Sequence, residues 1–372
     1  SWSVSAYYGE HESDFFINNT VNASLGEDTP RDFDAGSYGQ EDINLNADFS
    51  MPVGNDVSLA FGAEYREETF SIGAGQEESY IDGGLGSQGF STSTNGFPGF
   101  SPQISGDFSR ENYAVYVDGE WDVTDSILLA AAVRYEDFED FGDTTNFKLG
   151  ANWGITDTFG VRATASTGFK APTPGQSNAS NISTQLVKGV LTNQGVIPSN
   201  SPVAALRGGS TLEAEESTNL TLGVYFSLGE IDVTIDYFDI DVEDRLSLSS
   251  DYDLTDSERS QLTGQGIDAS DISTFRFFTN QFDTNTTGID VVVSTDTEWL
   301  GGVTTWNLAG NYTDTEVTSR NPDLLGDDRV NLIENGTPET RVNFTASHAM
   351  DAWRFLARVN YYDEFYDNEA GG

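Results

Sequence analysis

Apolar and polar residues alternate one by one over long stretches of this chain. In the run 159–166, the apolar residues Phe159, Val161, Ala163 and Ala165 take every second position. A period of two places apolar side chains on one face of a β-strand and polar side chains on the other. Pro172 and Pro174 follow, and proline has no backbone N–H to continue a ladder. The pattern therefore predicts a strand that ends near Gly168.

The same alternation recurs along the whole chain and predicts roughly thirteen strands, each about ten to fourteen residues long. A tilted strand that crosses a bilayer needs this length, whereas strands of a soluble sandwich are usually shorter. Tryptophan and tyrosine near the predicted strand ends are typical of the interfacial aromatic belts of membrane barrels. The pattern therefore predicts an all-β protein, a transmembrane antiparallel β-barrel.

Each predicted strand has one apolar face, which we expect to contact lipid, and one polar face, which we expect to line a lumen. The predicted lipid-facing set includes Val57, Phe61, Val133, Val161, Leu222, Ile235 and Phe355. The predicted lumen-facing set is Glu64, Arg66, Arg134, Glu136, Arg162, Asp236 and Arg358. A slip of one residue would reverse every member of both sets. We expect the charged lumen residues of the first half to form the wall against which a plug would press.

The connections between predicted strands alternate between short and long. Segments 51–56, 122–126, 154–158, 227–230, 298–302 and 350–352 are short, whereas 9–42, 69–111, 168–212, 245–273 and 315–339 are long. Membrane barrels place short turns on the periplasmic side and long loops outside. Nothing in this order predicts a second domain, so we expect a single barrel domain over 1–372.

Composition narrows the class of partner. The net charge is −44, from 61 acidic and 17 basic residues, and repulsion from phosphates makes nucleic acid an unfavourable partner. There is no cysteine, and no apolar run approaches the roughly 20 residues that a membrane helix requires. A negative mean hydropathy is compatible with a barrel, whose strands need an apolar residue only at alternate positions.

The sequence contains no convincing catalytic constellation, so we predict that the protein is not an enzyme. Gly84, Gly86 and Gly89 match G-x-G-x-x-G, but no buried strand precedes them and no helix follows. His11 and His348 are the only histidines, and no cluster of His or Cys could hold zinc. Asp251, Asp253 and Asp256 lack the Gly and the final Glu of an EF-hand loop. We predict no cofactor and no metal ligands, with calcium held between loops as the open alternative.

Five short motifs resemble, in order, the barrel of TonB-dependent outer-membrane receptors. They are Phe61–Arg66 (FGAEYR), Gly168–Pro172 (GFKAP), Leu212–Asn219 (LEAEESTN), Asp236–Arg245 (DYFDIDVEDR), and 280–290 with its NQF and TGID strings. Ala214 stands where the family has proline. The resemblance implies a nutrient receptor in the bacterial outer membrane, with membrane lipid and lipopolysaccharide around it.

That resemblance also implies parts that this sequence lacks. Plugged outer-membrane transporters have about 22 strands, so about thirteen would make an incomplete barrel and an internal fragment of a longer chain. We expect the plug domain, the TonB box and the contact with the TonB energy-coupling complex to lie outside it. The small-molecule nutrient is left open between an iron chelate, cobalamin and an oligosaccharide. The alternatives are a passive porin and a soluble acidic β-rich adhesin.

One loop differs from the others in charge. Segment 168–212 has no Asp or Glu but carries Lys170, Lys188 and Arg207, with Phe169 at its start. A positive loop in an acidic chain concentrates the field where an anionic group would dock. We therefore predict these four residues as ligand contacts. The alternative is a long lid that simply lacks acids.

Overall fold

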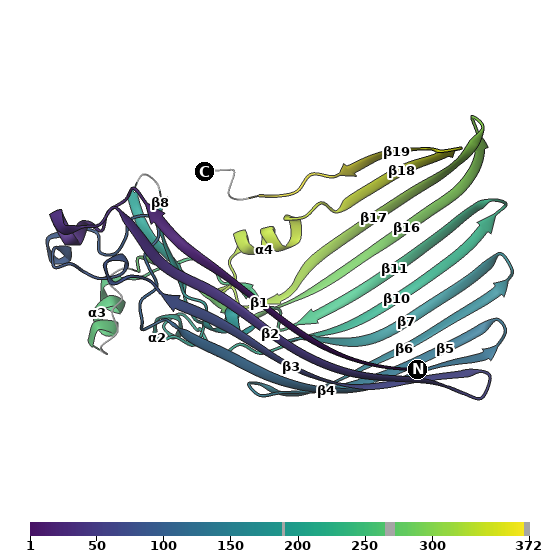
Figure 1. Cartoon of the computed structure of the whole chain (residues 1–372), viewed down its shortest axis with the longest axis horizontal. Coiled ribbons are helices and arrows are strands. Elements are labelled where there is room, and N and C mark those ends of the chain that lie inside the picture. Colours follow the sequence, from purple (N-terminus) through teal and green to yellow (C-terminus); the bar gives the residue numbers. More distant parts are fainter. Residues whose placement is uncertain (188–189, 265–271, 368–372) are drawn as a thin grey trace.

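A computed structural model describes residues 1–187, 190–264 and 272–367, and its main feature is one antiparallel sheet of 13 strands (Figure 1). The strand order follows the chain, β1-β2-β3-β4-β5-β6-β7-β10-β11-β16-β17-β18-β19. The all-β prediction and the number of strands are therefore confirmed.

The bounds of these strands are β1 Trp2–Asn18, β2 Asp32–Val53, β3 Val57–Ala74, β4 Gly106–Thr124, β5 Ile127–Phe138, β6 Gly142–Thr156, β7 Phe159–Lys170, β10 Glu215–Leu228, β11 Ile231–Glu243, β16 Phe282–Trp299, β17 Gly302–Arg320, β18 Thr340–Met350 and β19 Trp353–Tyr362.

The expected strand lengths were too short. β2 has 22 residues, and β3 and β17 have 18 and 19. The predicted loop 9–42 is largely strand, because β1 continues to Asn18 and β2 begins at Asp32. Loop 69–111 shortens in the same way, and β7 passes Gly168 to end at Lys170. These extensions are rich in charged and polar residues on both faces, so the alternation that reveals the rest of each strand fades there.

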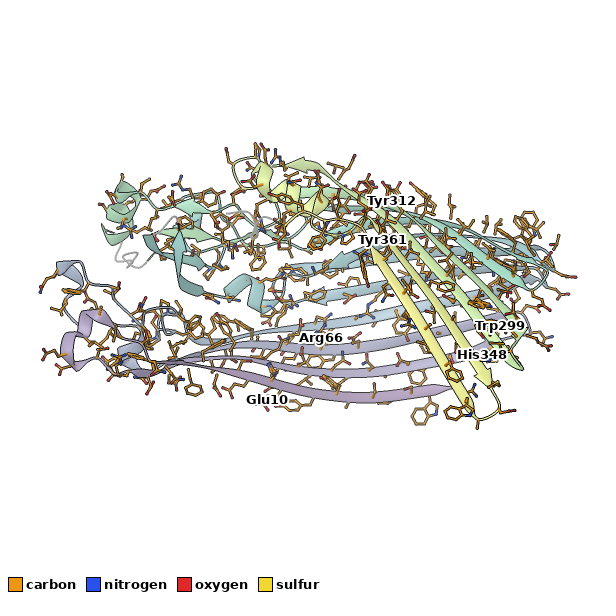
Figure 2. The ribbon with its side chains drawn as sticks, turned by 90° about the horizontal axis from the view of Figure 1, so that it is seen from above. Glu10, Arg66, Trp299, Tyr312, His348 and Tyr361 are labelled. Atoms are coloured by element: carbon orange, nitrogen blue, oxygen red, sulfur yellow. The ribbon has the colours of Figure 1, made fainter. Side chains whose placement is uncertain are left out.

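The sheet curls, so that β1–β4 lie opposite β18 and β19 and the sheet has a concave and a convex face (Figures 1 and 2). Short turns join the strands at one end, and longer segments lie at the other. The register places Phe61, Val117 and Val133 side by side on neighbouring strands, and likewise Val161, Val224 and Ile235. The apolar set predicted above shares this face.

This apolar face is exposed. Trp2, Phe147 and Leu222 have 74%, 56% and 49% of their surface accessible, and many other large apolar side chains are similar. Towards the loops the face ends in tyrosines whose hydroxyls donate to a neighbouring acid: Tyr8 to Glu10 (3.0 Å), Tyr65 to Glu67 (3.0 Å) and Tyr113 to Glu111 (3.1 Å). Tyr312 and Tyr361 lie away from the turns that join the strands, whereas Trp299 lies near them (Figure 2). An apolar band between two aromatic rows is the surface of a barrel in lipid.

The segments at the loop end contain the remaining elements. They are the 3-10 turns η1 Ala23–Asp28, η2 Glu77–Ser79 and η3 Gly86–Gln88, the helices α1 Pro174–Asn178, α2 Pro202–Ala205, α3 Asp256–Gly264 and α4 Asp327–Asn335, and the strands β8 Asn181–Val187, β9 Val190–Val196, β12 Ser247–Leu248, β13 Tyr252–Asp253, β14 Thr274–Arg276 and β15 Phe278–Thr279. In the described ranges, no helix is both long and apolar enough to span a membrane.

A pair of neighbouring substitutions tests which face contacts lipid. In lipid vesicles, Leu222→Arg should destabilise the whole protein by about 2–4 kcal/mol, because arginine on the lipid face must be desolvated. Thr221→Arg, one residue away on the polar face, should destabilise the folded protein clearly less. Denaturant titration in vesicles measures both. The reverse order would contradict this assignment of faces.

Candidate functional site

The concave face is held together by polar side chains that reach across an intervening strand. Arg162 on β7 binds Asp236 on β11, with Nε 2.7 Å from Oδ1. The strand between them is β10, and the residue below the bridge is Gly223. A β-carbon added to Gly223 would lie 2.0 Å from Asp236 Oδ1. Glycine is therefore required here for the ion pair to cross β10.

The same arrangement recurs elsewhere on this face. Tyr116 on β4 donates to Asp48 on β2 (2.8 Å) above Gly62. Tyr225 on β10 donates to Asn152 on β6 (2.9 Å) above Gly160. Strands two apart are separated by about 10 Å, so such contacts need side chains that converge, as they do on a concave surface.

The predicted lumen-facing residues all lie on this concave face, and several come into contact. Arg134 pairs with Glu64 at 2.8 Å across Ala114 and with Glu136 at 2.6 Å. Arg66 pairs with Glu68 at 2.6 Å, whereas Arg358 donates to the hydroxyl of Thr345 at 3.1 Å. Their contact with a plug stays a prediction.

Arg110 on β4 is a buried centre that the sequence analysis missed. Its side chain is 5% exposed and forms an ion pair with Glu68. It also donates to the carbonyl of Pro172 and lies over the rings of Phe138 and Phe141, 5.4 and 5.7 Å from their centroids. No local motif marks this arginine, because its partners come from three separate segments.

Arg110 thereby fixes the turn that follows β7. Phe169 packs on the same two rings, at centroid distances of 5.2 and 5.7 Å. Beyond Pro172, Thr173 caps α1: its hydroxyl accepts from Gln176 N (3.1 Å), and the Gln176 side chain accepts from Thr173 N (2.9 Å). Phe169 is therefore part of the packing of the wall, and its role as a ligand contact stays a prediction.

The long segments after β7, β11 and β17 pack into one unit, which we call the loop assembly. Its sheet, β13-β14-β9-β8, joins strands from two of the segments. Its apolar core draws on all three and comprises Ile197, Val203, Ala204, Leu254, Leu262, Ile272, Phe275, Phe277 and Leu324. These loops therefore form a folded layer at the loop end of the sheet.

Inside this assembly, Arg207 is already paired. Its Nη2 lies 2.8 Å from Glu258, and its guanidinium lies over the ring of Tyr252. Glu258 also completes the cap of α3, and its hydrogen bond from the backbone of Thr255 lowers its pKa, as do the Thr255 hydroxyl and Arg207. The stabilisation by this carboxylate is present above the ordinary pKa of glutamate and is lost as the pH falls through the lowered value.

Lys170, another predicted cation of this segment, has an acidic partner of its own. Lys170 Nζ lies 3.6 Å from Glu215 at the top of the wall, and Lys188 lies outside the described residues. The structure thus gives Lys170 and Arg207 separate acidic partners. That they contact a ligand stays a prediction.

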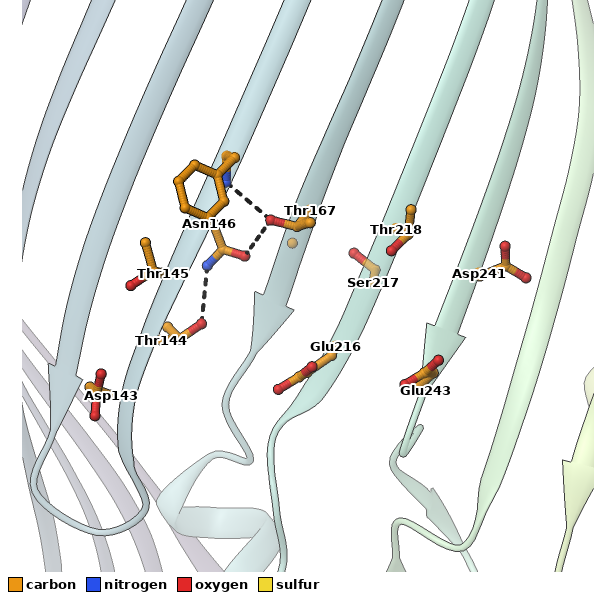
Figure 3. A pocket seen from close by; sticks show the side chains of 12 residues that line it. Asp143, Thr144, Thr145, Asn146, Thr167, Glu216, Ser217, Thr218, Asp241 and Glu243 are labelled. Carbon is orange, nitrogen blue, oxygen red and sulfur yellow. Dashed lines mark hydrogen bonds between the residues drawn. The ribbon is translucent and has the colours of Figure 1, made fainter.

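A pocket of about 350 Å³ lies where β6 and β7 separate (Figure 3). Their ladder ends at Lys148 and Ser166, and above it the hydroxyl of Thr167 accepts from Phe147 N (3.0 Å) and donates to Asn146 (3.2 Å). The rim carries four carboxylates: Asp143, Glu216, Asp241 and Glu243. Such a rim disfavours an anionic ligand, so we do not place nutrient binding here.

In the described part of the chain, no group of three or more His, Cys, Asp or Glu residues could hold a metal ion. The prediction of no metal ligands and its alternative, calcium held between loops, both stay untested. His348 Nδ1 lies 2.8 Å from the hydroxyl of Thr304, and His11 Nε2 lies 3.1 Å from that of Ser13.

Comparison with known proteins identifies the class. The family described as "TonB dependent receptor-like, beta-barrel" matches residues 1–372. The chain therefore belongs to the TonB-dependent receptor family, as the strand order and the five motifs predict.

One sequence relative and several solved structures resemble the chain. The ferric enterobactin receptor PirA of Pseudomonas aeruginosa is 26% identical over 229 residues, which are 61% of this chain and 28% of that protein. The solved siderophore receptor PirA from P. aeruginosa superposes with a TM-score of 0.56 at 16% identity, covering 96% of this chain and 56% of that one.

Two further solved structures share the fold. A double mutant of the ferric enterobactin receptor PfeA from P. aeruginosa gives a TM-score of 0.64 at 15% identity, over 97% of this chain and 46% of that one. The FrpB iron transporter from Neisseria meningitidis gives a TM-score of 0.56 at 11% identity, over 96% of this chain and 47% of that one. This chain thus spans about half the length of these solved relatives.

A mutant cycle can test whether the Arg162–Asp236 ion pair requires glycine at position 223. Gly223→Ala should destabilise the full-length receptor by about 1–2 kcal/mol, because the new methyl group breaks a charge-assisted contact. In an Arg162→Gln/Asp236→Asn background that cost should shrink.

Gly150→Ala is the matched control, because its β-carbon would have only ordinary contacts, 3.6 Å from Ala130. It should be neutral or slightly stabilising, since alanine loses less chain entropy on folding. Unfolding midpoints in denaturant measure all four variants. Equal costs at Gly223 in both backgrounds would contradict the role of the bridge.

Proposed function

We propose that the whole protein is an outer-membrane receptor that binds an iron chelate at its loop end and imports it using energy from the TonB complex. The observation that carries this proposal is the combination of a lipid-compatible convex face with a charged concave face below a folded loop assembly. A chelate that passes along the concave face contacts polar side chains throughout, whereas lipid contacts only the apolar band of the convex face.

The names of the relatives favour an iron chelate over cobalamin or an oligosaccharide as the cargo. The sequence relative is named as a ferric enterobactin receptor, and a solved relative was determined with enterobactin bound. Membership of the family supports TonB coupling through a segment outside this sequence. The same relatives are receptors by name, which supports a transport role rather than catalysis.

Uptake by the full-length receptor tests this proposal. A host without its own siderophore receptors should grow on ferric enterobactin when it carries the gene, and radioactive iron should accumulate. Deleting the host's TonB should abolish both, because import against a gradient requires coupled energy. Cobalamin uptake in the same strain serves as the comparison substrate.

Two results would overturn the proposal. Iron accumulation that persists without TonB would indicate a passive porin. Uptake of cobalamin or of an oligosaccharide without uptake of any ferric chelate would retain the receptor class but exclude iron as the cargo.

A further inference from the structure

The pocket of about 350 Å³ where β6 and β7 separate lies on the convex face of the sheet. Side chains alternate along a strand, so Phe147 in its lining shares the face of Leu149, which is 63% exposed. On the neighbouring strands Thr218 lies opposite both Thr167 and Asp241, which places these lining residues on the same face. The pocket is therefore part of the surface that contacts lipid.

This pocket lies at the height of the lipid headgroups. Its residue Thr145 is opposite Tyr135 on β5, and Tyr237 on β11 precedes Asp241 of the rim. Both tyrosines are exposed at the loop end of the apolar band, where aromatic residues mark the boundary between membrane and water. A lipid that enters the pocket therefore does so with its headgroup.

The convex face of these strands carries acids and no base. Glu216 and Glu243 of the rim lie directly opposite each other, and like charges in that position repel. The basic residues of β6, β7, β10 and β11 all lie on the concave face by alternation: Lys148, Arg162 and Lys170. Within the described residues, no rim carboxylate has an ion-pair partner. A cationic headgroup is therefore attracted here and an anionic one repelled.

An apolar hollow of about 570 Å³ adjoins the pocket on the side away from the loops. Ala165 of β7 lies between Leu149 of β6 and Leu220 of β10, so a small side chain is flanked by two large ones. Each of these three residues is the next on its face after a lining residue of the pocket: Phe147, Thr167 and Thr218. The pocket and the hollow thus lie end to end along β7, and we call them together the β7 groove.

We propose that the β7 groove binds one outer-leaflet lipid whose headgroup carries a primary ammonium group. Such a group has three N–H donors, and the rim offers carboxylate and hydroxyl acceptors for them. The acyl chain lies in the hollow and buries apolar surface there. A bare cation would leave the hollow empty, whereas a lipid fills both parts. The proposal depends on the convex face contacting lipid and not on the proposed cargo.

Lipid binding to the full-length protein tests the headgroup by native mass spectrometry. The protein is stripped of lipid in detergent and given phosphatidylethanolamine, phosphatidylcholine or phosphatidylglycerol with the same acyl chains. Phosphatidylethanolamine should bind about tenfold more tightly than the other two, because it alone presents ammonium N–H donors to the rim. Glu216→Gln/Glu243→Gln should remove this preference. The matched control Glu10→Gln/Glu41→Gln, an opposed pair of acids on the convex face of β1 and β2, should keep it.

A second pair of variants tests the hollow. Ala163→Leu/Ala165→Leu should weaken the binding of phosphatidylethanolamine about threefold or more, because the added side chains occupy the space of the acyl chain. Ala47→Leu/Ala63→Leu is the matched control, since these alanines lie opposite each other on β2 and β3, and it should bind like the wild type. Phosphatidylethanolamine should also raise the unfolding midpoint of both controls and of neither groove variant.

Three results would overturn the proposal. The first is equal binding of the three lipids, and the second is an equal loss in a groove variant and its control. The third is binding of phosphatidylglycerol that exceeds that of phosphatidylethanolamine once magnesium is added, which would show that the acids hold a metal ion instead. No ferric chelate enters these measurements, so they decide the site independently of the cargo.

Discussion

A wall that is one sheet thick has no interior, and this constraint governs the rest of the structure. Each strand must present one side chain in two to an apolar surrounding and the other to water, while its backbone groups pair with both neighbours. Accordingly, the large apolar side chains of the strands are exposed, as Trp2 and Leu222 illustrate. The main apolar core lies in the loop assembly instead, around Phe275, Phe277 and Leu262.

Without a core, cohesion beyond the ladders comes from polar contacts on the concave face. Curvature brings side chains from alternate strands together, provided that the residue between them is small. Gly223 and Gly62 meet this condition below the Arg162–Asp236 and Tyr116–Asp48 bridges. Glycine, which weakens an ordinary strand, here allows a contact across two strands that a larger residue would block.

The alternation of apolar and polar residues made the part of each strand nearer the short turns predictable from the sequence. Val133 and Arg134 are assigned to opposite faces by alternation alone, and the register agrees. The upper ends of β1 and β2 escaped prediction because both faces are polar there. The contacts of Arg110 and Arg207 escaped for another reason: their partners come from distant segments, and single-chain patterns carry no information on such pairings. The absence of acids in 168–212 led to Lys170 and Arg207 as ligand contacts, which stays a prediction, and their acidic partners, Glu215 and Glu258, lie beyond that segment.

The shared core of the loop assembly has a consequence for how this receptor diversifies. Surface loops of a barrel are usually free to change in length and sequence one at a time. Here Val203, Phe275 and Leu324 come from three different loops and pack in one cluster. A substitution or insertion in any one of them alters the packing of the other two, so the three segments are expected to vary as a set. Grafting new specificity onto this receptor, by selection or by design, therefore requires exchanging all three loops together.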